Sequence, residues 1–125
     1  MDKLSIQFDY KPIPADKDGN ILKENALIVS TSGRIDSETA PAFDSKLTEA
    51  VETSSYVVVN LKGVDYMSSA GLRAIVKASQ AAQTKGSALK LAAVPEEINS
   101  VMYTVGLNQK ISSFANVDEA VASFW

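Results

Sequence analysis

A short run of apolar, mostly β-branched residues constrains the fold of this chain most. The run is YVVVNL at residues 56–61, and its apolar residues are nearly continuous. Such a run is typical of a strand that is covered on both faces. From Ala70 to about Lys85 the apolar residues recur at helical spacing, and Gly86 is placed to end that helix. The two segments predict a central parallel strand that is followed by a crossover helix.

The rest of the chain continues this alternation of strands and helices. Strands are predicted at residues 4–10, 26–35 and 88–94, with a weak one at 110–114. A first helix should begin within residues 37–40, with Asp36 and Ser37 as N-cap candidates. Another should begin with Pro95 in its first position and end at Gly106, and the last should span residues 117–124.

These elements predict an α/β fold in a single small domain that comprises residues 1–125. We expect a mixed four- to five-stranded β-sheet with an antiparallel edge, because a turn rather than a helix connects the first two strands. Right-handed crossovers then place the helices mainly on one face of the sheet. Residues 10–25 hold two prolines and an Asp18-Gly19 pair, so we expect an extended loop or hairpin insertion there.

Composition excludes several classes of function. The chain has no cysteine and no histidine, which removes thiol chemistry, the commonest general base and the commonest metal ligand. We therefore expect no metal and no cofactor.

The charge of the chain argues against nucleic acid as a partner, because its 12 basic residues are dispersed and its net charge is −3. No apolar run is long enough to span a membrane and the N-terminus has no pattern of a secretion signal, so we expect a cytoplasmic protein.

Two adjacent serines stand where the buried strand should give way to the second helix. Ser68 and Ser69 lie in the stretch VDYMSSAGLRAIV at residues 64–76. A nucleophilic serine is the first hypothesis, but it would need a lysine such as Lys62 or Lys77 as its base. A helix cap is the second, and it explains Ser68 adequately. The third is a phosphorylation switch, because an exposed helix N-terminus accommodates a phosphate. The residues alone do not choose between the last two.

A family resemblance bears on this choice. The segment LKGVDYMSSAGLRAIV at residues 61–76 resembles the signature of the anti-sigma factor antagonists, which are bacterial members of the STAS domain group. GRIDSETAPAF at 33–43 is similar to the family segment that opens the first helix. VGLNQKISSFANVDEAVASF at 105–124 resembles its closing strand and helix. The resemblance extends from about residue 26 to the C-terminus.

The resemblance implies a regulatory binding protein without catalytic activity. Members bind an anti-sigma factor that is also a serine kinase, and phosphorylation of one serine ends that binding until a serine phosphatase restores it. In the family the phosphorylated serine lies two positions before the glycine, which selects Ser69, with Ser68 as a second candidate. The aspartate that commonly precedes this serine is replaced here by Ser68. The chain itself is expected to be a monomer or weak dimer.

The partner-binding surface should then comprise the loop 64–69, the start of the second helix and the aspartate before the first helix. Its residues are Asp36, Asp65, Met67, Ser68, Ser69, Ala70, Gly71, Arg73 and Lys77. The alternative is a STAS adaptor, or a sensor of a small molecule or nucleotide, that phosphorylation does not regulate. The six glycines are scattered and form no phosphate-binding loop, which gives nucleotide binding no support.

Overall fold

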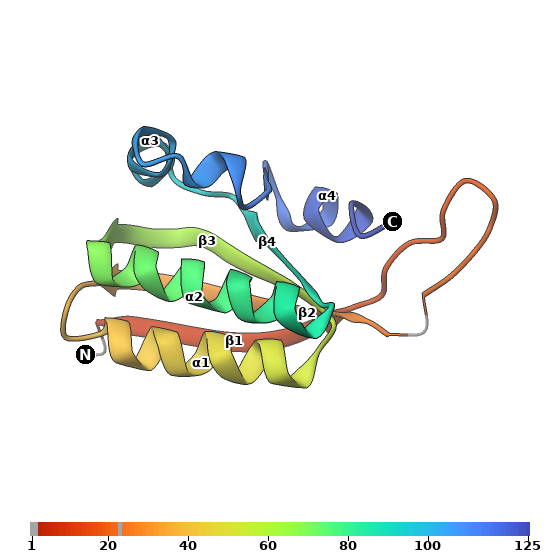
Figure 1. The fold of residues 1–125 in the computed structure, drawn as a ribbon, viewed down its shortest axis with the longest axis horizontal. Helices are drawn as coiled ribbons and strands as arrows, with labels where there is room; N and C mark the ends of the chain where they lie inside the picture. The colour runs from red at the N-terminus through yellow and green to blue at the C-terminus, as the bar shows by residue number, and fades with distance from the viewer. Residues whose placement is uncertain (1–2, 23) are drawn as a thin grey trace.

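The computed structural model of the chain describes residues 3–22 and 24–125. Its strands form one sheet in the order β1-β2-β3-β4-β5 (Figure 1). The strands are β1 (Leu4–Lys11), β2 (Ala26–Ile35), β3 (Tyr56–Met67), β4 (Ala88–Ala92) and β5 (Ser113–Phe114). Among these described strands β1 pairs antiparallel with β2, while the other neighbours are parallel. The predicted mixed sheet with an antiparallel edge and β3 at its centre is confirmed.

The helices alternate with the strands along the chain. They are α1 (Ala40–Thr53), α2 (Ser69–Lys85), α3 (Glu96–Thr104) and α4 (Val117–Ala122), with a short 3-10 helix η1 (Leu107–Gln109) before β5. In Figure 1, α1 and α2 run side by side along the sheet, and α4 lies apart from them near the C-terminus. None of the helices in the described part of the chain has the length and apolar composition that crossing a membrane requires.

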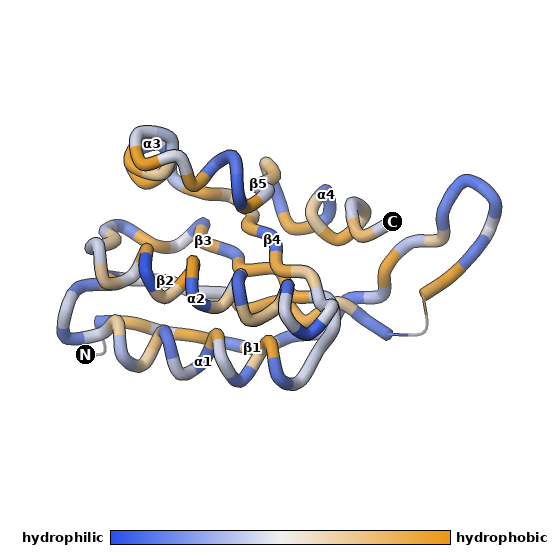
Figure 2. The backbone as a smooth tube through the Cα atoms, in the orientation of Figure 1, coloured by the Kyte–Doolittle hydropathy of each residue, from blue (hydrophilic) through white to orange (hydrophobic). Residues whose placement is uncertain are grey.

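Both faces of the central strands are buried. Leu27, Val29, Val57 and Val59 belong to the larger core with α1 and α2, whereas Ile28 and Val58 belong to a smaller core with α4. Because successive side chains in a strand point to opposite faces, the runs ALIV and YVVV supply both cores at once. Figure 2 shows this concentration of hydrophobic residues in the central strands. The continuous apolar pattern of residues 56–61 was therefore interpreted correctly.

The connection between β1 and β2 extends away from the sheet as a long loop (Figure 1). Ile13 anchors the near end of the loop, with 6% of its surface exposed in the smaller core. The Trp125 indole N–H donates to the Pro14 carbonyl oxygen at 2.6 Å, which joins the C-terminus to the loop. The outer bend is hydrophilic in Figure 2, and there Asp16 accepts hydrogen bonds from the backbone N–H groups of Asp18 and Asn20.

The structure corrects several predicted boundaries. β3 continues to Met67 instead of ending at residue 61. Its second half is mostly exposed, with Val64 as its buried residue, and β2 pairs with it through two register shifts. Gly63 lets the two strands approach each other, since a Cβ there would lie 2.6 Å from Ser32 Cβ. β4 ends at Ala92 because Ala93 has a φ of +54°. α3 begins at Glu96, with Pro95 as its N-cap residue, and α4 ends at Ala122.

Candidate functional site

The carboxyl ends of β2 and β3 lie side by side and bring the starts of α1 and α2 to one edge of the sheet. Ile35 and Met67 are paired in the parallel register. The Ser68 N–H donates to the Ile35 carbonyl oxygen at 2.7 Å, so the two strand ends stay joined where the chain leaves the sheet. The helix that follows each strand therefore starts at this edge.

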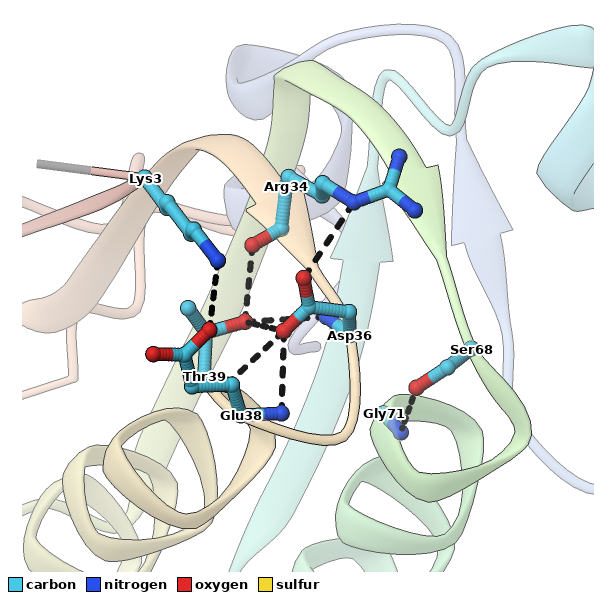
Figure 3. A network of polar contacts seen from close by, with 7 residues as sticks. All are labelled: Lys3, Arg34, Asp36, Glu38, Thr39, Ser68 and Gly71. Carbon is cyan, nitrogen blue, oxygen red and sulfur yellow. Dashed lines mark hydrogen bonds and ion pairs between the residues drawn. The ribbon is translucent and has the colours of Figure 1, made fainter.

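The two adjacent serines have different structural roles. Ser68 is the N-cap of α2: its backbone is extended, and its Oγ accepts a hydrogen bond from the Gly71 N–H at 3.3 Å (Figure 3). It is half-buried, whereas Ser69 is the first residue of the helix and is exposed. The predicted cap is confirmed for Ser68, and Ser69 presents its side chain to solvent.

Gly71 lets α2 pack closely against the strand ends. It is buried, and a Cβ at this position would lie 2.7 Å from Ile35 Cγ2 and 2.8 Å from Met67 Cγ. Real Cβ atoms do not approach other atoms so closely, so any larger residue must displace the helix or both side chains. The absence of a side chain at Gly71 therefore lets the first turn of α2, which carries the serines, lie close to the ends of β2 and β3.

Asp36 organises the turn before α1. Its Oδ1 accepts hydrogen bonds from the backbone N–H groups of Glu38 and Thr39 at 2.9 and 3.0 Å (Figure 3). The Thr39 hydroxyl donates to the Arg34 carbonyl oxygen at 2.8 Å and accepts from the Asp36 N–H at 2.9 Å. The hydrogen bond from the Thr39 N–H is the main cause that holds the pKa of the Asp36 carboxyl below its ordinary value.

The predicted N-cap of α1 was wrong in position. The N-cap residue is Thr39, and not Asp36 or Ser37.

Arg34 and Tyr66 are residues that the sequence analysis missed. They face each other in the β2–β3 register, and the Arg34 guanidinium carbon lies 4.1 Å from the Tyr66 ring centroid. Arg34 Nε also contacts Asp36 Oδ2 at 3.2 Å. Tyr66 stays 42% exposed. Arg34 lies two positions before Asp36, and Tyr66 lies two positions before Ser68. Because both pairs stand at the ends of neighbouring strands, this equal spacing could have indicated that Arg34 and Tyr66 belong to the site.

The other predicted contact residues lie on two sides of α2. Arg73 and Lys77 line a groove of about 300 Å³ between α1 and α2, where Lys77 Nζ pairs with Asp44 Oδ2 at 3.2 Å. Asp65 and Met67 line a second hollow, of about 440 Å³, together with α3. Ala70 is half-buried beside Ser69. The predicted residues therefore share one end of the molecule but do not form one pocket.

The second hollow includes residues of α3 that the sequence did not suggest. Its apolar lining comes from Val64, Met67, Leu72, Ile98 and Val101, and three carboxylates line it as well, from Asp65, Glu96 and Glu97. Val101 is 48% exposed. Within the described residues, no three His, Cys, Asp or Glu side chains gather in a way that could hold a metal ion. The chemistry of this end of the molecule is that of a contact surface with apolar and acidic parts.

Comparison with known proteins places the chain in a family. The model of the STAS domain matches residues 15–120. The anti-sigma-B factor antagonist of Bacillus subtilis (strain 168) is 31% identical over 98 residues, which are 78% of this chain and 90% of the relative. An anti-sigma factor antagonist from Mycobacterium paratuberculosis has the same fold, with a TM-score of 0.70 at 23% identity, covering 95% of this chain and 93% of that one.

The fold is also that of the anti-sigma factor antagonist SpoIIAA of Bacillus, whose structure is known in an unphosphorylated and a phosphorylated form. The TM-scores are 0.66 and 0.61, each at 14% identity. The alignments cover 92% of this chain in both cases, and 93% and 96% of the two SpoIIAA chains. The chain therefore belongs to the STAS domain family and is a homologue of anti-sigma factor antagonists.

Proposed function

We propose that this chain is an anti-sigma factor antagonist whose binding to its anti-sigma factor is ended by phosphorylation of Ser69. The anti-sigma factor would also be the serine kinase, and a serine phosphatase would restore binding. The relative from Bacillus subtilis is an anti-sigma-B factor antagonist, and SpoIIAA exists in a phosphorylated form. We place this exchange in the cytoplasm. The switch needs a serine that a kinase can reach and whose phosphate the fold tolerates.

The observation that carries the proposal is the difference between Ser68 and Ser69. Ser68 is half-buried and its hydroxyl oxygen accepts the Gly71 N–H, so a phosphate on that oxygen would disturb the helix cap. Ser69 is exposed at the first position of the 17-residue helix α2. A kinase therefore reaches Ser69 without unfolding the cap, and we retain Ser68 only as a second acceptor.

The position of Ser69 also makes a phosphate compatible with the fold. A phosphoserine carries a charge of about −1.5 to −2 at neutral pH. The first turn of α2 contains no acidic residue, and the positive end of a helix dipole favours an anion there. The added charge should therefore leave the fold intact and act on whatever protein covers Ser69.

The proposed docking surface is the end of the sheet around Ser69. It comprises Asp36, Asp65, Met67, Ser68, Ser69, Ala70, Gly71, Arg73 and Lys77. Half-buried Met67 lies beside exposed Asp65, so an approaching partner meets apolar surface and negative charge together. A phosphate in the middle of this surface would have to be desolvated or would repel acidic groups of the partner. Either effect ends the complex.

We infer a binding regulator rather than an enzyme. A nucleophilic serine needs a base, and the chain has no histidine. Of the two lysines considered, Lys77 has its ammonium engaged by Asp44 at 3.2 Å. We therefore expect a fluorophosphonate probe to leave Ser69 unlabelled. Labelling of Ser69 in the wild type, and its loss in Ser69→Ala, would contradict this inference.

The direct test is to incubate the protein with the candidate serine kinases that are encoded near it and to locate the phosphate by mass spectrometry. We expect modification of Ser69, none in Ser69→Ala, and weaker kinase binding for Ser69→Asp than for the wild type. Ser112→Asp is the matched control, since Ser112 is exposed but precedes β5, at the opposite end of the sheet. The proposal fails if neither Ser68 nor Ser69 is modified and Ser69→Asp binds as tightly as the wild type.

A further inference from the structure

Arg73 lies one helical turn after Ser69 on α2, and both residues are exposed. Residues four positions apart are neighbours on the surface of a helix, with Cβ atoms about 5–6 Å apart. Helical side chains lean toward the N-terminus of their helix, so the guanidinium of Arg73 can reach the turn that carries Ser69. A charged group on Ser69 would therefore have this guanidinium as its neighbour.

The positive charge of Arg73 has no acidic partner among the described residues. The ion pairs in that part of the chain involve other cations. The carboxylate that lines the same groove belongs to Asp44 of α1, and the groove also includes Lys77. Asp44 Oδ2 already pairs with Lys77 at 3.2 Å, and its Oδ1 is buried. Arg73 therefore remains available to bind another anion.

Two backbone N–H groups at the start of α2 are available as well. The N–H of Gly71 donates to Ser68 Oγ, and that of Leu72 donates to the Ser68 carbonyl oxygen. Those of Ser69 and Ala70 have no acceptor among the residues that the structure describes. Free N–H groups at a helix N-terminus attract anions. An anion that is attached to Ser69 is thus favoured by its own turn and by the cation of the next turn.

We propose that Arg73 binds the phosphate of phosphorylated Ser69, as an ion pair within one helix. The order of the charges favours this pair, because an anion that precedes a cation by four residues is the more stabilising arrangement. Arginine suits the role, since its planar guanidinium donates two parallel hydrogen bonds to phosphate oxygens. The inference rests on the proposed phosphorylation of Ser69 and adds the residue that holds the phosphate.

The ion pair would change the docking surface at two positions at once. The unphosphorylated chain presents a neutral serine and an uncompensated cation there. After phosphorylation the guanidinium is occupied by a phosphate of charge about −1.5 to −2, so the pair carries a net charge of about −0.5 to −1. A partner that places an acidic group against Arg73 then loses this attraction and meets an anion instead. Phosphorylation thereby removes a favourable contact as well as adding a repulsive one.

A chain with phosphoserine incorporated at position 69 during translation tests the inference without any kinase. Phosphorus NMR follows the second ionisation of the phosphate, which ordinarily has a pKa of about 6. Because Arg73 favours the dianion, Arg73→Gln should raise the midpoint of this titration by a few tenths of a pH unit, and Arg73→Lys should raise it less. The charges of Asp44 and Lys77 in the groove are the same in all these chains.

Lys85→Gln is the matched control for the loss of one positive charge from α2. Lys85 is the last residue of this 17-residue helix, so it lies about 24 Å along the helix from Ser69. That distance exceeds the screening length of about 10 Å at 0.1 M salt. The titration midpoint should therefore be the same in Lys85→Gln as in the wild-type sequence.

The Nε–H signal of Arg73 gives a second readout that needs no variant. It should shift on phosphorylation of Ser69, and its proton should exchange more slowly with water. Circular dichroism checks that each variant is folded. Either an unchanged titration midpoint in folded Arg73→Gln or an unchanged Nε–H signal overturns the inference and leaves the proposed switch standing. A kinase that never modifies Ser69 would defeat the switch but would not alter this titration, so the two failures are distinguishable.

Discussion

The hydroxyl oxygen of Ser68 lies 3.3 Å from the backbone nitrogen of Gly71, while the neighbouring Ser69 extends into solvent. This relationship ties the stability of α2 to the first serine. It leaves the second free to change chemically. Each role can be measured separately.

Ser68→Ala should lower the free energy of unfolding by about 1 kcal/mol, because the N-cap hydrogen bond is lost. Ser69→Ala should change it by only a few tenths of that amount, since the side chain is exposed and alanine favours helix. Denaturant unfolding of both variants checks this. Ser68→Asp, which keeps a capping oxygen, is the matched control and should restore most of the loss. Equal losses in the two alanine variants would contradict the assignment of the cap.

Ser69→Asp should stabilise the isolated protein slightly, by about 0.3–1 kcal/mol at low salt, because a negative charge then lies at the N-terminus of α2. Salt should screen the gain. Thermal unfolding at two ionic strengths measures it, with Ser69→Asn as the uncharged control. A clear loss of stability would show that this turn does not tolerate an anion, and it would weaken the proposed switch on structural grounds.

Gly71→Ala should destabilise the protein by about 1–3 kcal/mol, the usual range for overpacking. The added methyl would lie 2.7 Å from Ile35 Cγ2 and 2.8 Å from Met67 Cγ. Ile35→Ala/Gly71→Ala should recover part of the loss relative to the sum of the single changes, because alanine at position 35 lacks the Cγ2 that the added methyl would meet. A double-mutant cycle in denaturant unfolding gives this coupling. Strict additivity would mean that the glycine acts through its backbone rather than through this contact.

Removing the Asp36 carboxylate should flatten the dependence of stability on acid pH. Hydrogen bonding, chiefly from the Thr39 N–H, lowers the pKa of Asp36 in the folded state. Because the pKa is lower in the folded state, the ionised carboxylate stabilises the fold at any pH above the pKa of the unfolded chain, which is about 3.9. This stabilisation is lost as the pH falls below that value and through the pKa of the folded state. Asp36→Ser keeps an oxygen acceptor without the charge. The wild type should exceed it in stability at pH 7 and approach it below about pH 4 in unfolding measured across pH. A gap that stays constant from pH 7 to pH 2 would refute this linkage.

Lys90→Ala should loosen the C-terminal helix. The ammonium donates to the carbonyl oxygen and the Oγ of Ser123, each at 2.9 Å, and lies 5.1 Å from the Phe124 ring centroid. Burial lowers the pKa of the Lys90 ammonium from its ordinary value. We expect a loss of about 1–3 kcal/mol and faster amide exchange in residues 117–124. Lys90→Met, which keeps the apolar stem, should lose less, and unchanged exchange in both variants would rule out the clamp.

The order and type of the elements were predictable from the sequence, because each depends on local pattern. The run at residues 56–61 indicated a central strand, and the structure adds why its pattern is continuous: alternate valines enter different cores. The extension of β3 to Met67 was not predictable, since residues 62–66 are exposed except for Val64 and lack a regular apolar pattern, and they pair with β2 through its register shifts. Tertiary pairing decides the conformation there, and local propensity does not.

The candidate site was predictable in its loop but not in its surroundings. Spacing to Gly71 and capping chemistry separated Ser68 from Ser69, and the structure agrees with the cap. The sequence pattern placed the N-cap of α1 too early in the chain. Asp36 accepts the backbone N–H groups of Glu38 and Thr39 as a capping residue would, but it lies three positions before the N-cap Thr39. Arg34 over Tyr66, and the hollow shared with α3, require the relative placement of elements that are distant in sequence.

The division of β3 between two cores limits how the length of this chain can vary. Val58 faces the α4 side, while Val57 and Val59 face α1 and α2. An insertion of one residue just before Val57 would shift the following side chains to the opposite faces and exchange the two cores. The outer bend of the β1–β2 loop has no alternation of buried faces to preserve, because its side chains near Asp18 and Gly19 are exposed. Among homologous chains, changes in length should therefore collect in that loop and avoid the central strand.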